Sequence, residues 1–186
     1  GVRGDLSGPN GWLVGHQGYE YIELGRVWQV GLIAGMLLWL FLVYRAVKPA
    51  LKAEKDKGGL THLLLYASVT IPLFYSVGLL YTPGTHIAIA DYWRWWIIHL
   101  WVEGMFEVFT VVTCGLLFVN MGLVTRRSAS RAIKFQLVIL LGSGLIGTGH
   151  HYYWIGGNDF WISWGSIFSG LEVIPLTLLA VEAAEQ

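Results

Sequence analysis

Five apolar stretches alternate with short polar segments along the chain, and this pattern predicts a helical membrane protein. The stretches are residues 24–47, 60–81, 92–124, 133–155 and 161–183. Each is long enough to cross a hydrocarbon core of about 30 Å as an α-helix, which takes about 20 residues. The third stretch is longer than a bilayer requires, so we expect it to tilt or protrude. The predicted fold is all-α, with five transmembrane helices that form part of a larger helical bundle.

The polar segments and prolines set the predicted boundaries. Residues 1–23 are mostly polar or glycine-rich and predict an extracytoplasmic segment, whereas 24–186 form one transmembrane part with no separate second domain. Pro49 stands at the start of a lysine-rich loop, where we expect the first helix to end. Pro72 falls inside the second stretch and predicts a kink that neighbouring helices tolerate.

Composition supports a membrane protein and restricts the chemistry. The chain is 55% hydrophobic and 13% charged, against about 25% charged residues in soluble domains. Its formal net charge is zero, so no basic field indicates a nucleic-acid partner. Cys114 is the single cysteine, which argues against disulfides and against a thiolate metal site. The chain begins at Gly1 without a methionine, and we interpret it as an excerpt of a longer polypeptide.

The basic residues predict the orientation in the membrane. Nine of the twelve lie in or beside two loops on one side, and only Arg3, Arg26 and Arg94 belong to the other. The nine are Arg45, Lys48, Lys52, Lys55, Lys57, Arg126, Arg127, Arg131 and Lys134. Because cytoplasmic loops carry an excess of lysine and arginine, these two loops are predicted to be cytoplasmic. The segment before the first span then lies outside.

The third span contains one histidine and two carboxylates that require an explanation. A charged side chain at the bilayer centre costs about 2.5–3.5 kcal/mol on insertion scales. His99, Glu103 and Glu107 are spaced four residues apart, which places them on one face of an α-helix, about 6 Å from one to the next. An imidazole and a carboxylate one turn apart can share a metal ion. The alternative is a buried hydrogen bond between His99 and Glu103.

A second histidine group lies at the same predicted depth. His150 and His151 follow Gly147, Thr148 and Gly149, small residues that permit close approach of a helix or a flat cofactor. Adjacent histidines alone are a weak signal, because their side chains point about 100° apart on a helix. Together with the third span they predict a metal site of three imidazoles and one carboxylate. This ligand set favours non-haem iron over copper and leaves zinc open.

Other carboxylates have two interpretations each. Glu172, deep in the fifth span, is either hydrogen-bonded to another helix or placed beside the metal to order water or relay protons, and we favour the second. Glu107 has the same two interpretations. Glu20 and Glu23 precede the first span, where a solvated surface is the simpler account, although paired carboxylates could hold calcium.

Several motifs resemble the catalytic subunit of bacterial nitric oxide reductases, a divergent branch of the haem–copper oxidase superfamily. They are WWIIHLWVEGMFE, GTGHH, WGSIFSGLEVIPL and GHQGYEYIELGRVWQ, and the last is closer to the single-chain, quinol-dependent type. Oxygen-reducing oxidases have His-Pro-Glu-Val-Tyr in the corresponding helix. Here His99 is followed by Leu100, and Glu103 stands at the tyrosine position.

The resemblance implies a ligand set and a pocket. His99, His150, His151 and Glu103 would bind non-haem iron, and Glu107 and Glu172 would shape the pocket and its proton supply. Glu20 matches a position near a calcium ion that links haem propionates. The high-spin and low-spin haem b groups would be held by histidines outside these residues.

The resemblance also implies a function in denitrification. The whole protein would reduce nitric oxide to nitrous oxide in the bacterial inner membrane, with its active site toward the periplasmic side. Its partners would be lipid, the remaining helices of the polypeptide, and quinol or, alternatively, cytochrome c as electron donor. Three alternatives stay open: a copper-containing oxygen reductase, a family member with a changed substrate, and a membrane anchor without metal.

The carboxylate at position 103 provides the sharpest expectation. Replacement of Glu103 by Gln keeps the shape and removes the charge, so we expect iron retention and nitric oxide turnover to fall severely. Glu23→Gln, at what is predicted to be an exposed surface, is expected to do little.

The predicted topology can be tested by cysteine-accessibility labelling of the whole protein. Single cysteines near Lys55 and near Arg127 should react with an impermeant reagent from the same, cytoplasmic side. Reaction from opposite sides would show that the number of spans between them, or the orientation, is wrong.

Overall fold

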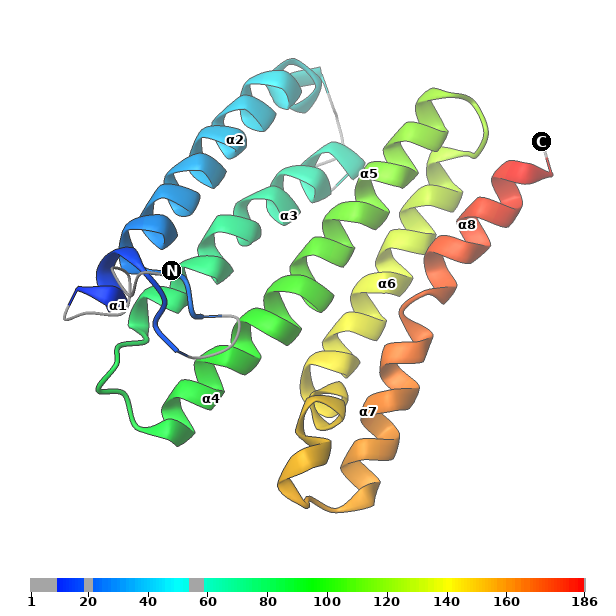
Figure 1. The fold of residues 1–186 in the computed structure, drawn as a ribbon. Helices are drawn as coiled ribbons and strands as arrows, with labels where there is room; N and C mark the ends of the chain where they lie inside the picture. Colours follow the sequence, from blue (N-terminus) through cyan, green and yellow to red (C-terminus); the bar gives the residue numbers. More distant parts are fainter. Residues whose placement is uncertain (1–9, 19–21, 54–58, 186) are drawn as a thin grey trace.

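The computed structural model describes residues 10–18, 22–53 and 59–185, which form a bundle of membrane-length helices (Figure 1). Five helical runs are long and apolar enough to cross a membrane. They are Arg26–Ala53, Leu60–Leu80, Ile87–Asn120, Arg126–Trp154 and Asp159–Ala184. No strand occurs in these described ranges, where one isolated β-bridge joins His16 to Leu24. The predicted all-α membrane class is confirmed.

Several of the spans contain more than one helical element. The α-helices are α1 (Gly11–Val14), α2 (Arg26–Ala53), α3 (Leu60–Tyr75), α4 (Ile87–Trp95), α5 (Glu107–Asn120), α6 (Arg126–Ile146), α7 (Asp159–Leu171) and α8 (Ile174–Ala184). Three elements have tighter or wider turns: the 3₁₀ helices η1 (Ser76–Leu80) and η3 (Gly147–Ile155), and the π-helix η2 (Trp96–Phe106).

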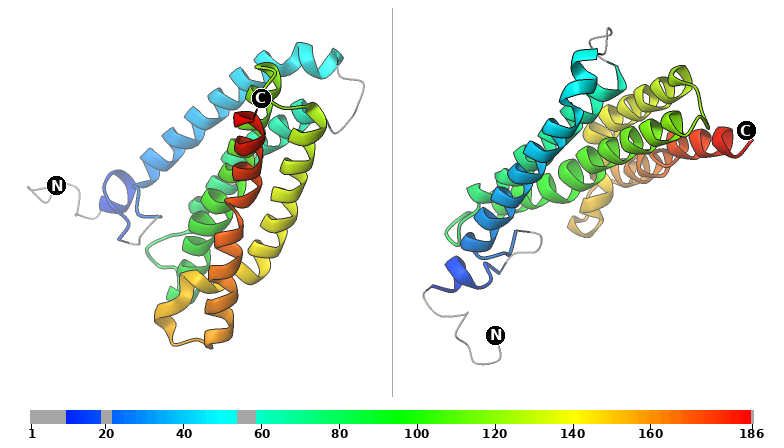
Figure 2. Two further views of the ribbon diagram at one scale, coloured as in Figure 1. Left: turned by 90° about the vertical axis from the view of Figure 1, so that its right-hand side faces the viewer. Right: turned by 90° about the horizontal axis from the view of Figure 1, so that it is seen from above.

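The spans pack chiefly on their neighbours in the sequence. Helix α2 packs on α3, α3 packs on η2 and α5, and α5 packs on α6. Helix α6 also contacts both α7 and α8. Figure 1 shows the resulting order, with α2 and α3 on one side, α4 and α5 in the middle, and α6, α7 and α8 on the other, and Figure 2 shows the same bundle from two further directions.

The main apolar core lies where α3, α5, α6 and α8 meet. Val112, Ala129 and Ile133 have no exposed surface, and Leu179 is 2% exposed. Gly115 of α5 permits the close packing, because a Cβ there would lie 3.3 Å from Ile133 Cδ1 and 3.7 Å from Leu179 Cδ2. The core therefore fixes the start of α6 against α5. His150 and His151 lie beyond the other end of α6.

Helix α2 presents most of its apolar side chains outward. Gln29 is the one buried residue that the structure shows in this helix, whereas Leu38, Phe41 and Leu42 are more than half exposed. Apolar surface of this kind is stable against lipid or against further helices. Two polar residues near the start of α2, Arg26 and Gln29, are by contrast turned toward the bundle.

Arg26 joins the start of α2 to the second span. Its guanidinium donates hydrogen bonds to the carbonyl of Tyr81, to the carbonyl of Gly78 at 3.4 Å, and to Gln29 Oε1 at 2.9 Å. Gln29 in turn donates to the carbonyl of Ile22 at 3.4 Å. The guanidinium of Arg26 thus donates to two backbone carbonyls at the end of η1. It joins the first span to the second.

One helix boundary differs from that expected at a proline. Helix α2 does not end at Pro49, which lies inside it, but continues to Ala53. Proline removes one N–H donor, and near the end of a helix the freed carbonyl can be satisfied by water, while the following Ala50, Leu51 and Lys52 favour helix. Pro72 lies inside the second span, as expected, and this span tightens to 3₁₀ turns from Ser76.

The third and fifth spans contain irregularities that 3.6-residue periodicity does not predict. The π-helix η2 occupies the middle of the third span, so its turns are wider than those of an α-helix. The fifth span is interrupted between α7 and α8 at Glu172 and Val173, and Pro175 lies in the first turn of α8. Both irregularities lie at residues of the candidate site.

Arg26 offers a test of this packing. In Arg26→Lys a single ammonium replaces a planar fork of donors, so carbonyls at the end of η1 lose partners. We expect the free energy of unfolding to fall by about 1–3 kcal/mol, measured as a lower Tm of the whole protein in detergent. Arg45→Lys, on the exposed part of the same helix, is the matched control. Equal shifts in the two variants would contradict the role of Arg26.

Candidate metal centre

Three imidazoles and one carboxylate converge between the third, fourth and fifth spans. Oε2 of Glu103 lies 2.9 Å from His99 Nδ1, 3.1 Å from His150 Nε2 and 3.2 Å from His151 Nε2. The four potential ligand atoms all lie within 4.8 Å of one another. The structure thus brings together the four residues for which the sequence predicts metal binding.

Local helix geometry positions each member of the cluster. His99 and Glu103 lie on η2, where they are one turn apart and face the same way. His150 and His151 lie on the 3₁₀ helix η3, and their Nε2 atoms approach to 2.8 Å although the residues are adjacent. Trp95 stacks on the His99 ring with 6.1 Å between centroids, which restricts rotation of that imidazole.

Two glycines bring the histidine pair against α7. A Cβ on Gly149 would lie 2.2 Å from the carbonyl oxygen of Trp161, and a Cβ on Gly165 would lie 2.6 Å from the backbone nitrogen of His150. Only glycine fits at such distances. The small residues before the histidines therefore admit a neighbouring helix, which was one of the two alternatives that the sequence left open.

The outer nitrogens of two imidazoles are occupied by backbone carbonyls. His99 Nε2 lies 3.1 Å from the carbonyl oxygen of Ser143, and His150 Nδ1 lies 3.2 Å from that of Gly165. A carbonyl only accepts, so these nitrogens carry the protons. In neutral rings the inner nitrogens, His99 Nδ1 and His150 Nε2, then present lone pairs toward Glu103, as they do when a metal is bound.

The arrangement fits a bound cation. Lone pairs and a carboxylate that face one another within 3.2 Å repel, and protonating every inner nitrogen would set cationic rings against one another. A divalent ion among the four residues removes both problems. Three nitrogen donors and one oxygen donor without thiolate suit iron, and they also suit zinc. The cluster is open on one side, since the side chains of Glu103, His150 and His151 are 27%, 16% and 13% exposed, against 2% for His99.

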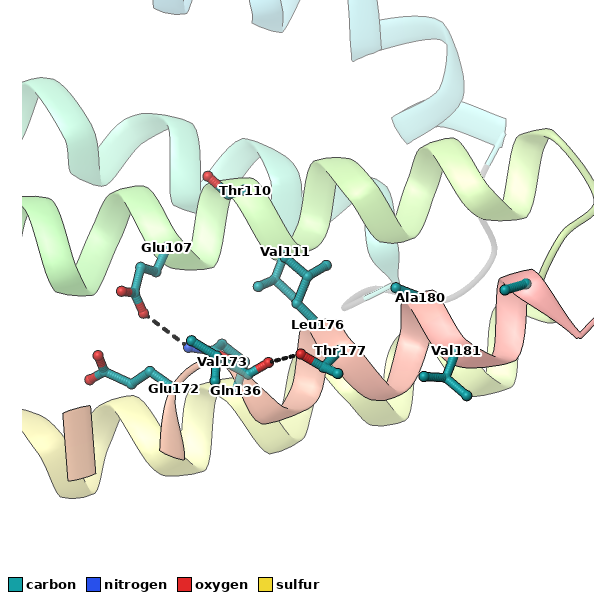
Figure 3. A pocket seen from close by; sticks show the side chains of 11 residues that line it. Glu107, Thr110, Val111, Gln136, Glu172, Val173, Leu176, Thr177, Ala180 and Val181 are labelled. Carbon is teal, nitrogen blue, oxygen red and sulfur yellow. Dashed lines mark hydrogen bonds between the residues drawn. The ribbon is translucent and has the colours of Figure 1, made fainter. Parts of the chain in front are cut away.

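Glu107 lies outside the four-residue cluster, as the predicted ligand set has it, and its place on one face with His99 and Glu103 stays a prediction. It begins α5, just after the π-helix, and Gln136 Nε2 donates to its Oε2 at 3.3 Å. Both residues line a cavity of about 580 Å³ between α5, α6 and α8, together with Glu172. Figure 3 shows Glu107 and Glu172 beside each other at one end of this cavity and Ala180 and Val181 at the other.

Glu172 is buried at the interruption of the fifth span. Its exposed fraction is 6%, and the hydroxyl of Ser143 donates a short hydrogen bond to its Oε1. The sequence interpretation of a carboxyl hydrogen-bonded to another helix is therefore confirmed. Its predicted role in ordering water or relaying protons stays a prediction, as does that of Glu107.

Residues that the sequence interpretation missed hold the site in place. Ser143 contacts both His99 and Glu172, Gly165 accepts from His150, and Gln136 donates to Glu107. Serine, glycine and glutamine are ordinary in membrane helices, so composition alone does not single them out. Ser143 lies seven residues before His150, about two turns along one helix face, which is the one signal that spacing offers.

The two carboxylates before the first span have different outcomes. Glu20 lies outside the described residues, so its predicted place near calcium stays a prediction. Glu23 is not on an exposed surface as predicted: it is half-buried, and its Oε2 is buried without a hydrogen-bond partner among the described residues. Residues 10–18 fold back beside it, since the backbone N–H of Gln17 donates to the carbonyl of Glu23, which local polarity could not indicate. Glu23→Gln is therefore unsuitable as a neutral control.

The fold and the cluster define a polytopic helical membrane protein with a histidine-rich site of the type that binds transition metals. The chain belongs to the family of cytochrome c and quinol oxidase polypeptide I, whose sequence profile matches residues 6–184. It is similar to a nitric oxide reductase subunit of Stutzerimonas stutzeri, with 28% identity over 171 residues. That alignment covers 92% of this chain and 35% of the relative, so the chain spans about a third of that protein's length. The resemblance that the motifs carry is thus confirmed.

Removal of the charge at Glu103 tests the cluster as a metal site. We expect Glu103→Gln, made in the whole protein, to reduce retained non-haem metal by about tenfold or more, because a neutral amide is a poor partner for a divalent cation. The measurement is elemental analysis per haem after dialysis against a chelator. Glu185→Gln, on an exposed residue where α8 ends, is the control. Full metal in the Glu103 variant would leave the three histidines as the only candidate ligands.

Proposed function

We propose that the whole protein reduces nitric oxide to nitrous oxide at this centre. In this reaction two nitric oxide molecules take up two electrons and two protons and yield one nitrous oxide and one water. The supporting observation is the carboxylate of Glu103, whose Oε2 lies within 3.2 Å of one ring nitrogen of each of the three histidines. Similarity to a nitric oxide reductase of Stutzerimonas stutzeri agrees with this choice.

The residues of the cluster would hold non-haem iron. His99, His150 and His151 supply neutral nitrogen ligands, and Glu103 supplies a negative charge that favours a hard cation over copper. When bound, such an ion supplies Lewis-acid chemistry, which polarises an oxygen of the substrate. The open side of the cluster leaves room for a second redox group, and we propose haem b held by histidines outside these residues.

Glu107 and Glu172 would handle the protons. Both carboxyl groups line one cavity near the cluster, where Glu172 is buried and Glu107 is half-buried. A carboxyl group in such a place can bind a proton and release it toward the reacting centre. Glu172 is the better positioned of the two, because Ser143 connects it to His99.

The surroundings of the protein follow from its class and its charges. Five apolar spans make it a multi-pass membrane protein whose exposed faces require lipid or further helices. We propose that it lies in a bacterial inner membrane with the cluster toward the periplasm, since Lys52 at the end of α2 and Arg126 and Arg127 at the start of α6 lie at the opposite end of the spans. We propose quinol as the electron donor, with cytochrome c as the alternative, and calcium near Glu20.

The reaction can be tested on the purified whole protein with an electron donor and nitric oxide. We expect nitric oxide consumption at an electrode, one nitrous oxide by gas chromatography for every two nitric oxide molecules consumed, and one iron beyond the haem iron by elemental analysis. The same preparation is given oxygen in a parallel assay. Copper in place of non-haem iron, with oxygen consumption and no nitrous oxide, would identify an oxygen reductase instead.

A further inference from the structure

Ser143 is a buried residue that contacts two functional groups through different atoms. It lies near the end of α6 and is 2% exposed. Its carbonyl oxygen lies 3.1 Å from His99 Nε2, and its hydroxyl donates to Glu172 Oε1. His99 comes from the third span and Glu172 from the fifth, so one residue of the fourth span links them both.

The carbonyl of Ser143 faces His99 near the end of α6, which continues to Ile146. A carbonyl oxygen has two lone pairs, so it can accept from an imidazole as well as from a helix N–H. The contact fixes the proton of the His99 ring on Nε2 and directs Nδ1 toward Glu103.

The hydroxyl of Ser143 is held in one direction by its surroundings. A Cβ on Gly147 would lie 2.8 Å from Ser143 Oγ and 3.5 Å from His99 Cε1, so the turn at Gly147 packs directly on both groups. Glu172 is itself 6% exposed, so its carboxyl has little access to alternative donors in water. The hydrogen bond between them therefore determines where this carboxyl lies.

We infer that Ser143 is a positioning residue that holds the carboxyl of Glu172 in a defined place relative to the metal ligand His99. The hydroxyl fixes Glu172, and the carbonyl fixes His99. Movement of either group is transmitted to the other through a single residue. This inference deepens the proposed function. The turnover assay below rests on that function, whereas the measurement of Tm does not.

Ser143→Ala separates the two contacts, because it removes the hydroxyl and keeps the carbonyl. In the whole protein we expect retained metal to stay at the wild-type level while nitric oxide turnover falls about tenfold, in kcat and not in KM. In a Glu172→Ala background the same change should have no further effect on turnover or on Tm, since the acceptor is already gone. Ser143→Cys, whose thiol is a weaker donor, should give a smaller loss.

Ser68→Ala is the matched control. Ser68 is also fully buried in a membrane helix, but its hydroxyl donates to the carbonyl of Leu64 within its own helix. Its loss should leave turnover unchanged. Additive effects of Ser143→Ala and Glu172→Ala on Tm would overturn the inference, as would loss of metal in Ser143→Ala equal to its loss of turnover. If the wild type does not reduce nitric oxide but the two changes are non-additive in Tm, the proposed function fails and the positioning role stands.

Discussion

Burial of ionisable groups inside an apolar bundle is the constraint on which this structure depends. Glu103 and three imidazoles converge where no bulk water can solvate them fully, and each charge left uncompensated there is costly. Two rings direct their N–H groups outward to carbonyls, so the inward-facing atoms are those with lone pairs. The third, fourth and fifth spans must therefore be held in one position relative to each other. A small shift would leave the carboxylate of Glu103 and the inward-facing lone pairs without a positive partner.

That relative position of the spans depends on irregular helix geometry. The wider turns of η2 and the tighter turns of η3 lie on either side of the cluster, and the fifth span breaks at Glu172. Beside these irregular turns, the imidazoles of His99 and His150 donate to the backbone carbonyls of Ser143 in α6 and Gly165 in α7. These contacts join the histidines to the neighbouring helices.

The sequence predicts the spans and the four cluster residues, because both follow from simple rules. Hydropathy locates each span, and the cost of a charge in lipid singles out His99 and Glu103. The helix end expected at Pro49 was wrong, since a proline near a terminus costs less than one in the interior. Ser143 and Gln136 were missed since their importance arises only when the spans meet.

The contacts of Gly149 and Gly165 have a consequence for how such a protein can change over evolutionary time. Each glycine fills a place where the neighbouring backbone leaves no room for a methyl group, and the carbonyl of Gly165 accepts from His150 of the cluster. Neither position can drift to alanine alone, since the step that separates the two helices also displaces His150. Helix packing and the geometry of the histidine cluster therefore change together, and a lineage that alters this cluster must do so through other residues or rebuild the contact as a whole.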